Sequence, residues 1–110
     1  FVEKNVSAIN ILNKNIKKLK LEKKVLIINK SVYKFITTPF KKPFNLVFLD
    51  PPFKENNIVE IIDSLKKTGK LDKNALFIVH RHKKSKDMFP ESFKILDEKK
   101  YGLSKIIFGN

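Results

Sequence analysis

Residues 44–53 read Phe-Asn-Leu-Val-Phe-Leu-Asp-Pro-Pro-Phe, and this stretch decides the fold prediction. Its first six residues are nearly all apolar, as in a strand of a parallel sheet that is covered on both faces. Asp50-Pro51-Pro52 ends that strand, because proline has no N–H to donate to a sheet. Residues 57–69 then predict a helix with apolar residues at helical spacing and a closing glycine.

The same alternation continues on both sides of this stretch. Towards the N-terminus the sequence predicts the end of a strand near residue 3, a helix capped by Asn5 or Ser7, a strand at 25–28 and a short helix at 32–36. Towards the C-terminus it predicts a strand at 75–79 and a hairpin of 93–96 with 103–108. The pattern predicts an α/β protein with a parallel sheet, whose last strand runs antiparallel because no helix separates it from its neighbour.

The composition is strongly basic. Lys and Arg number 24 and Asp and Glu 11, which gives a net charge of +13. Such a charge favours nucleic acid or an anionic membrane surface as partner. All the basic residues except Arg81 are lysines spread over every segment, however, as an AT-rich genome would also produce. Both explanations remain open.

Several classes of protein are disfavoured by the sequence. The chain has no cysteine, which excludes disulfides and thiolate metal sites. No apolar run approaches the ~18 residues of a membrane helix, and no signal peptide opens the chain, so we expect a cytoplasmic monomer without a membrane partner. All three glycines lie in the second half. Because α/β nucleotide-binding proteins place glycines early, we expect a single domain, residues 1–110, that is incomplete at its front.

Asp50-Pro51-Pro52-Phe53 is the candidate site, since open α/β sheets bind ligands beyond the carboxyl ends of their strands. The Asp50 carboxylate and a carbonyl of the rigid proline pair can accept both protons of an amino group, which turns the nitrogen lone pair towards an electrophile. Phe53 offers a flat face for a base. These residues predict methyl transfer to an exocyclic base amine without a metal. An ordinary surface turn is the alternative.

Other candidates follow other predicted strands. Glu3 can hold two ribose hydroxyls, although a glutamate near a helix N-terminus is also stabilised by the helix dipole. Ser31 and Val32 can face an adenine, although a helix cap by Ser31 explains the same residues. Contact with RNA phosphates and a plain exposed loop are both open for the basic run that contains Arg81, Lys83 and Lys84. Its two histidines lack a third ligand, so no metal is expected.

The order of these motifs resembles a known family. Phe-Val-Glu3, a helix with Asn15, Asp50-Pro51-Pro52-Phe53, and Tyr101-Gly102-Leu103-Ser104-Lys105-Ile106 resemble the bacterial 16S ribosomal RNA guanine-N2 methyltransferases, the RsmD family. The resemblance covers essentially all 110 residues. The Asp-Pro-Pro-aromatic motif alone is shared with amino-methyltransferases that act on DNA adenine or cytosine and on other RNAs. Tyr101 is expected to be a packing residue.

The resemblance implies a fold, a cofactor and residue roles. The fold is a Rossmann-like class I methyltransferase sheet that lacks its first strand and glycine-rich loop, so this chain alone is expected to be inactive and to bind cofactor poorly. Glu3 would bind the ribose of S-adenosylmethionine, Ser31 and Val32 would lie beside its adenine, and Asp50 would border the cofactor while holding the target amine. Phe53 would stack on guanine 966 of 16S RNA. The partner would be ribosomal RNA or the small subunit; a non-catalytic RNA-binding remnant is the remaining alternative.

Overall fold

The computed structural model describes residues 1–52, 54 and 57–110. These residues form two compact units, residues 1–39 and residues 40–110. In the part of the chain that the structure describes, no helix combines the length and the apolar character needed to cross a membrane.

The first unit is a strand–helix–strand–helix segment. Strand β1 (Val2–Glu3) leads into α1 (Val6–Lys18), and β2 (Ile28–Asn29) leads into α2 (Val32–Thr37). The two strands pair in parallel, with Glu3 opposite Asn29. Both predicted helices are confirmed, and Asn5 is the cap of α1, where its side chain accepts a hydrogen bond of 3.1 Å from the Ala8 N–H.

The strand predicted at residues 25–28 was placed too early. The structure pairs only Ile28 and Asn29, because β1 offers a partner of just two residues. The preceding residues are still tied to the start of the chain. The Phe1 ammonium donates to the Leu26 carbonyl at 2.8 Å, and the Ile28 N–H donates to the Phe1 carbonyl at 2.8 Å.

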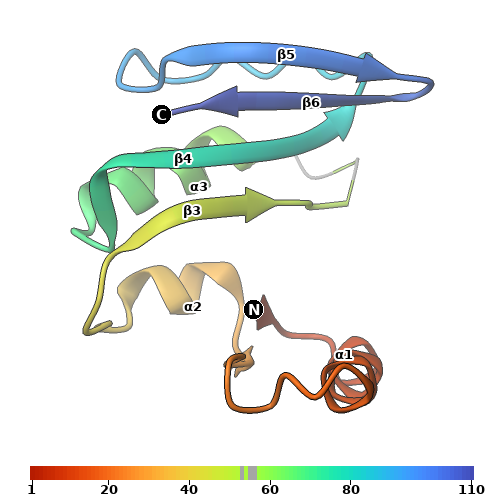
Figure 1. The fold of residues 1–110 in the computed structure, drawn as a ribbon. Coiled ribbons are helices and arrows are strands. Elements are labelled where there is room, and N and C mark those ends of the chain that lie inside the picture. Colours follow the sequence, from red (N-terminus) through yellow and green to blue (C-terminus); the bar gives the residue numbers. More distant parts are fainter. Residues whose placement is uncertain (53, 55–56) are drawn as a thin grey trace. The chain divides into compact units, whose positions relative to one another are not determined.

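The second unit is a four-stranded mixed sheet with one helix against it (Figure 1). Its elements are β3 (Phe44–Leu49), α3 (Ile58–Lys67), β4 (Leu71–His82), β5 (Ile95–Tyr101) and β6 (Ser104–Gly109). The strand order is β3-β4-β6-β5, in which β3 and β4 are parallel and the other pairs antiparallel. The predicted antiparallel last strand is therefore confirmed.

The closing hairpin differs from its prediction in its first strand. β5 begins at Ile95 rather than residue 93 and continues through charged residues to Tyr101, all of them exposed. The apolar pattern missed this strand because it lies at the sheet edge, where charged side chains are common. Gly102 begins the two-residue turn with φ +55°, the positive value that type II′ hairpin turns require at this position. Tyr101 ends β5 and is 62% exposed, so its side chain is not one of the buried packing residues of this unit.

The core of the second unit lies between α3 and one face of the sheet. Alternate residues of β4 are buried on this face, and α3 buries its apolar stripe; together they include Ala75, Phe77, Val79, Ile58, Ile61, Ile62 and Leu65. Ile107 of β6 and Phe93 complete the core, and the Phe93 ring meets the Phe77 ring edge-on with centroids 5.6 Å apart.

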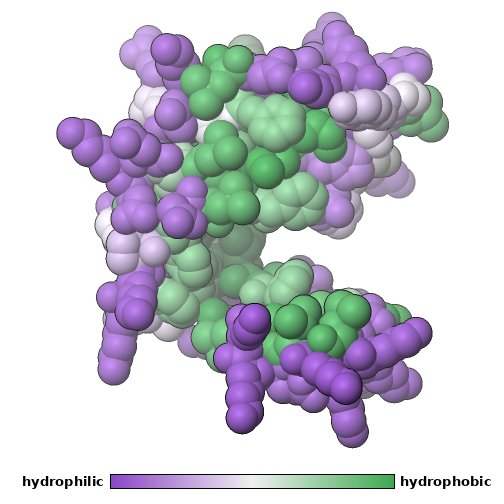
Figure 2. All heavy atoms as spheres, viewed as in Figure 1, coloured by the Kyte–Doolittle hydropathy of each residue, from purple (hydrophilic) through white to green (hydrophobic). Residues whose placement is uncertain are grey.

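The opposite sheet face carries exposed apolar side chains. On β3, Leu46 is 53% exposed and Phe48 is 61% exposed. Hydrophobic residues gather over the sheet of the second unit on the face turned away from α3 (Figure 2). Within the second unit α3 is the one helix among the described residues, and it covers one face of the sheet. That both faces are covered stays a prediction.

Candidate functional site

The end of β3 places Asp50 beside β4. Leu49 and Val79 are opposite each other in the parallel ladder, so the residues that follow them, Asp50 and His80, project from the same face of the sheet. The Asp50 Oδ1 atom lies 2.8 Å from His80 Nδ1. The Asp50 side chain is 55% exposed and the His80 side chain 23%. A carboxylate that solvent can reach is thus held on one side by an imidazole.

The second ring nitrogen of His80 contacts β6. His80 Nε2 lies 2.8 Å from Ser104 Oγ. β4 and β6 are antiparallel, and His80 is opposite Ile106, which makes Ser104 the diagonal neighbour of His80 on the same sheet face. Three strands therefore contribute one residue each to a chain of two hydrogen bonds.

The chemistry of these groups fixes the direction of the first hydrogen bond. An ionised carboxylate only accepts, so His80 Nδ1–H donates to Asp50. In a neutral ring Nε2 accepts from the Ser104 hydroxyl, and in a doubly protonated ring Nε2–H donates to it. The sequence prediction missed His80, the partner of Asp50, and Ser104, the second partner of His80. His80 and Ser104 lie at the same end of the sheet as the carboxyl end of β3. This position is the one sequence signal that could have identified them.

The other residues of the Asp-Pro-Pro-Phe motif are placed in part. Pro51 is half-buried and Pro52 is exposed. Phe53 lies outside the described residues, so its expected stacking role stays a prediction. The part of the site that the structure describes is the Asp50 carboxylate with the proline pair that follows it.

Glu3 lies at the end of β1 and turns into the start of α1. Its Oε1 atom accepts hydrogen bonds from the Lys4 N–H at 2.8 Å and the Asn5 N–H at 2.7 Å. These bonds fix the direction of the carboxylate and leave its second oxygen with acceptor capacity. Glu3 is the last residue of β1, at the strand end that the sequence predicted.

Ser31 caps α2 in the structure. Its Oγ atom accepts a hydrogen bond of 3.3 Å from the Lys34 N–H, and Val32 is the first helical residue. Both residues are half-buried. The capping role that the sequence left open is therefore present, and the adenine contact of Ser31 and Val32 stays a prediction.

The basic run lies partly inside β4 rather than in a loop, because residues 80–82 pair with residues 104–106 of β6. The placement of Arg81 in a solvated loop was wrong. Arg81 is 1% exposed, and its Nε and Nη2 atoms donate to the two carboxylate oxygens of Asp87 at 3.1 and 2.9 Å. Lys83 and Lys84 are exposed.

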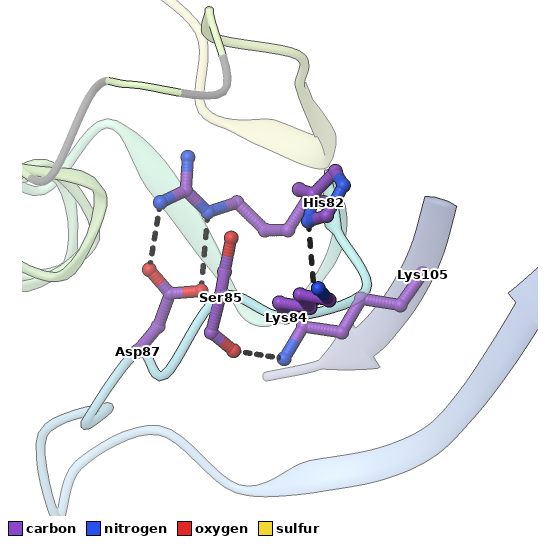
Figure 3. Close-up of polar contacts among 6 residues, drawn as sticks. His82, Lys84, Ser85, Asp87 and Lys105 are labelled. Atoms are coloured by element: carbon purple, nitrogen blue, oxygen red, sulfur yellow. Dashed lines mark hydrogen bonds and ion pairs between the residues drawn. The ribbon is translucent and has the colours of Figure 1, made fainter. Parts of the chain in front are cut away.

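The segment after β4 is tied back to the sheet by polar contacts (Figure 3). Asp87 holds the guanidinium described above, the Lys84 N–H donates to His82 Nδ1 at 3.2 Å, and Lys105 Nζ donates to the Ser85 carbonyl at 2.7 Å. Because its guanidinium is buried and bonded to Asp87 through two nitrogens, we do not carry Arg81 forward as an RNA contact. Among the described residues, no group of three or more His, Cys, Asp or Glu side chains is arranged to hold a metal ion.

Comparison with known proteins identifies the family. The family model described as conserved hypothetical protein 95, which is the RsmD family, matches residues 1–110. The chain belongs to the RsmD family. Ribosomal RNA small subunit methyltransferase D of Haemophilus influenzae is 35% identical to it over 105 residues, which are 94% of this chain and 54% of that protein. The protein of the same name from Buchnera aphidicola is 26% identical over 88 residues, which are 80% of this chain and 46% of that protein. This RsmD-family chain thus spans about half the length of these curated relatives.

Solved structures of similar proteins have the same fold as this RsmD-family chain. A crystal structure from Haemophilus influenzae, named as a methylase, matches with a TM-score of 0.81 and 33% identity over 99% of this chain and 69% of that one. A conserved hypothetical protein from Streptococcus pyogenes matches with a TM-score of 0.87 and 30% identity over 98% of this chain and 68% of that one. With the mixed sheet described above, these likenesses confirm the prediction of a partial class I methyltransferase fold.

Proposed function

We propose that the complete gene product containing these residues is an S-adenosylmethionine-dependent methyltransferase that modifies the exocyclic N2 of a guanine in small-subunit ribosomal RNA. The observation that carries the proposal is the Asp50 carboxylate, 55% exposed at the end of β3 and directly followed by two prolines. The names of the two relatives, ribosomal RNA small subunit methyltransferase D, support the RNA substrate.

The proposed role of the second unit is to hold the target amine. Asp50 accepts one amine proton, and a backbone carbonyl of the proline pair accepts the other. With both protons held, the nitrogen lone pair is no longer shared fully with the ring and can attack a methyl group in line. The carboxylate also stabilises the positive charge that develops on the nitrogen. Phe53 is proposed to stack on the base, which must leave its helix to reach the site.

The proposed role of the first unit is to bind the cofactor. S-adenosylmethionine, when bound, supplies an electrophilic methyl group. Glu3 fits this ligand, because an acidic side chain at the end of a parallel strand can accept hydrogen bonds from two ribose hydroxyls. Its orientation by the Lys4 and Asn5 amides suits that task. Ser31 and Val32 are proposed to lie beside the adenine, and Asp50 to border the cofactor.

The proposed partner is ribosomal RNA, free or in the small subunit. Lys83 and Lys84 follow β4 and are exposed, so they can contact phosphates. The net charge of +13 supports a polyanionic substrate. We propose that the protein is cytoplasmic, because ribosomal subunits are assembled in the cytoplasm. We also propose that it is a monomer.

Asp50→Ala tests the proposed site. In the complete gene product, with small ribosomal subunits as methyl acceptor, we expect this variant to lower kcat on the order of 100-fold or more, the usual scale for losing one electrostatic contact to a developing charge. Methyl transfer is measured as incorporation of labelled methyl into RNA. Asp72→Asn is the matched control, because it changes an exposed carboxylate at the start of β4 and should leave turnover unchanged.

The same assay separates the alternatives. Full turnover by Asp50→Ala would remove the site, and absence of turnover by the unaltered protein on every acceptor would favour a non-catalytic RNA-binding protein. Digestion of the product to nucleosides identifies the modified atom. N6-methyladenine or N4-methylcytosine in a DNA acceptor would contradict the guanine proposal while leaving the Asp50 role intact.

A further inference from the structure

We propose that His80 is a positioning residue that holds the Asp50 carboxylate, and that Ser104 fixes the orientation of the His80 ring. This inference rests on the proposed function. It goes beyond that function because it names the residues that aim the carboxylate at the amine.

The backbone after Asp50 explains why this carboxylate needs a side-chain donor. An aspartate in a turn commonly accepts from backbone N–H groups just ahead of it, as Glu3 does from Lys4 and Asn5. The next two residues after Asp50 are prolines, which have no N–H. The two residues that directly follow Asp50 therefore offer it no backbone donor, and His80 Nδ1 at 2.8 Å supplies a side-chain donor instead.

The hydrogen bond to His80 gives the two carboxylate oxygens of Asp50 different roles. Oδ1 accepts from Nδ1, while Oδ2 keeps its capacity to accept from an amine. A side chain that is 55% exposed would otherwise sample several rotamers in water. If the Asp50 side chain is already held in one rotamer when the substrate binds, less conformational entropy is lost in reaching the reactive geometry.

Ser104 holds the ring through its second nitrogen. The acceptor-only carboxylate of Asp50 places a ring proton on Nδ1, and the Ser104 hydroxyl, 2.8 Å from Nε2, can bond that nitrogen and so restrain the rotation of the ring. Ser104 is held in β6 between β4 and β5, opposite His82 and Tyr101. Its position is thus fixed by the two ladders of the sheet.

The same order of hydrogen bonds, Ser–His–Asp, occurs in serine hydrolases. A hydrolase also needs backbone N–H groups free to stabilise an oxyanion beside the serine. Ser104 is the first residue of β6 and is paired on both sides, opposite His82 and Tyr101, so the N–H groups that follow it serve the ladders. The positioning role therefore fits the surroundings of Ser104 better than a nucleophilic role.

Two substitutions of His80 test the proposal in the complete gene product. His80→Leu removes both ring nitrogens, and we expect kcat to fall about 10- to 100-fold, the range usual for groups that orient a functional ligand. KM for RNA and for S-adenosylmethionine should change little. His80→Asn retains an N–H donor one bond from Cγ, where Nδ1 stood, and should recover most of kcat. Equal losses in His80→Leu and His80→Asn would overturn the proposal.

A double-mutant cycle separates this proposal from the proposed function. If His80 acts through Asp50, His80→Leu should cause no further loss in the Asp50→Ala background. Full activity of Asp50→Ala would remove the proposed function. Loss of activity in Asp50→Ala with full activity in His80→Leu would instead remove only the positioning role of His80.

Two measurements on the complete gene product do not depend on turnover. Nitrogen-15 NMR of the histidine rings should show the His80 proton on Nδ1, with a shift of that signal in Asp50→Ala; a proton on Nε2 in the neutral ring would overturn the proposal. A fluorophosphonate probe should leave Ser104 unlabelled. Labelling that disappears in Ser104→Ala would assign a hydrolytic nucleophile and overturn the positioning role.

Discussion

Arg81 and Asp87 form an ion pair that is almost wholly withdrawn from water. Their side chains are 2% and 6% exposed, and two hydrogen bonds join them. The sheet alternation puts Arg81 on the same face as Phe77 and Val79, so its charge lies at the edge of the hydrophobic core. Removing one partner of such a pair leaves the other charge buried and uncompensated.

Asp87→Ala is therefore expected to destabilise the second unit strongly. The predicted loss in the free energy of unfolding is about 3–5 kcal/mol. Urea denaturation followed by circular dichroism measures it. The matched control is Asp63→Ala, which breaks the exposed i,i+4 pair between Asp63 and Lys67 in α3 and should cost about 0.3–0.5 kcal/mol. Similar losses of unfolding free energy in the two variants would show that the buried Arg81 does not depend on Asp87 for its stability.

At the scale of elements, β6 passes close to the segment that precedes β5 at Gly109. A Cβ at this position would lie 2.8 Å from the Lys94 carbonyl and closer still to the Phe93 ring. Phe93 is buried against Phe77, and its ring also stacks on Phe89 with centroids 4.8 Å apart. Neither the backbone nor the ring can move without disturbing the core.

Gly109→Ala should therefore cost about 2–3 kcal/mol of unfolding free energy, the usual range for overpacking. Gly69→Ala is the control. Gly69 has φ +68° and open space around it, so its variant carries only the conformational cost of about 1 kcal/mol. Thermal denaturation of both variants compares them, and a smaller effect at position 109 than at 69 would contradict the packing argument.

The sequence predicts an element well when its pattern depends on nearby residues alone, and poorly when it depends on pairing with a distant strand. Helices α1, α2 and α3 carry apolar residues at helical spacing and were predicted close to their bounds. β5 was misplaced because its residues are charged, and only pairing with β6 makes them a strand. The burial of Arg81 also follows from strand pairing, which extends β4 past the last apolar residue.

The candidate site was predictable in the same partial way. Asp50 stands out because a polar residue and two prolines end an apolar strand. The hydrogen bonds from His80 to Asp50 and to Ser104 could not be predicted, because His80 is 30 residues from Asp50 and 24 from Ser104 along the chain. Only the register of β3, β4 and β6 shows that these residues are neighbours.

At the scale of the molecule, the excess of positive charge is spread widely, so its role in RNA binding has to be tested by position. We expect Lys83→Gln with Lys84→Gln to lower the slope of log affinity against log salt by roughly 1 to 2, as two lost phosphate contacts would. Filter binding of the complete gene product to 16S RNA measures the slope. Lys17→Gln with Lys18→Gln in the last turn of α1 is the charge-matched control. Equal changes in the two pairs would indicate a diffuse effect of net charge.

The strand order of the second unit has a consequence for synthesis on the ribosome. β6 is translated after both of its neighbours, yet it lies between them. While β4 and β5 emerge, they have no common partner, and the Ser104 hydroxyl that His80 contacts has not been made. The hydrogen bond between His80 and Ser104 can therefore form only after β6 clears the exit tunnel. A premature stop codon just before Ser104 would leave β5 without its partner strand and His80 without this contact.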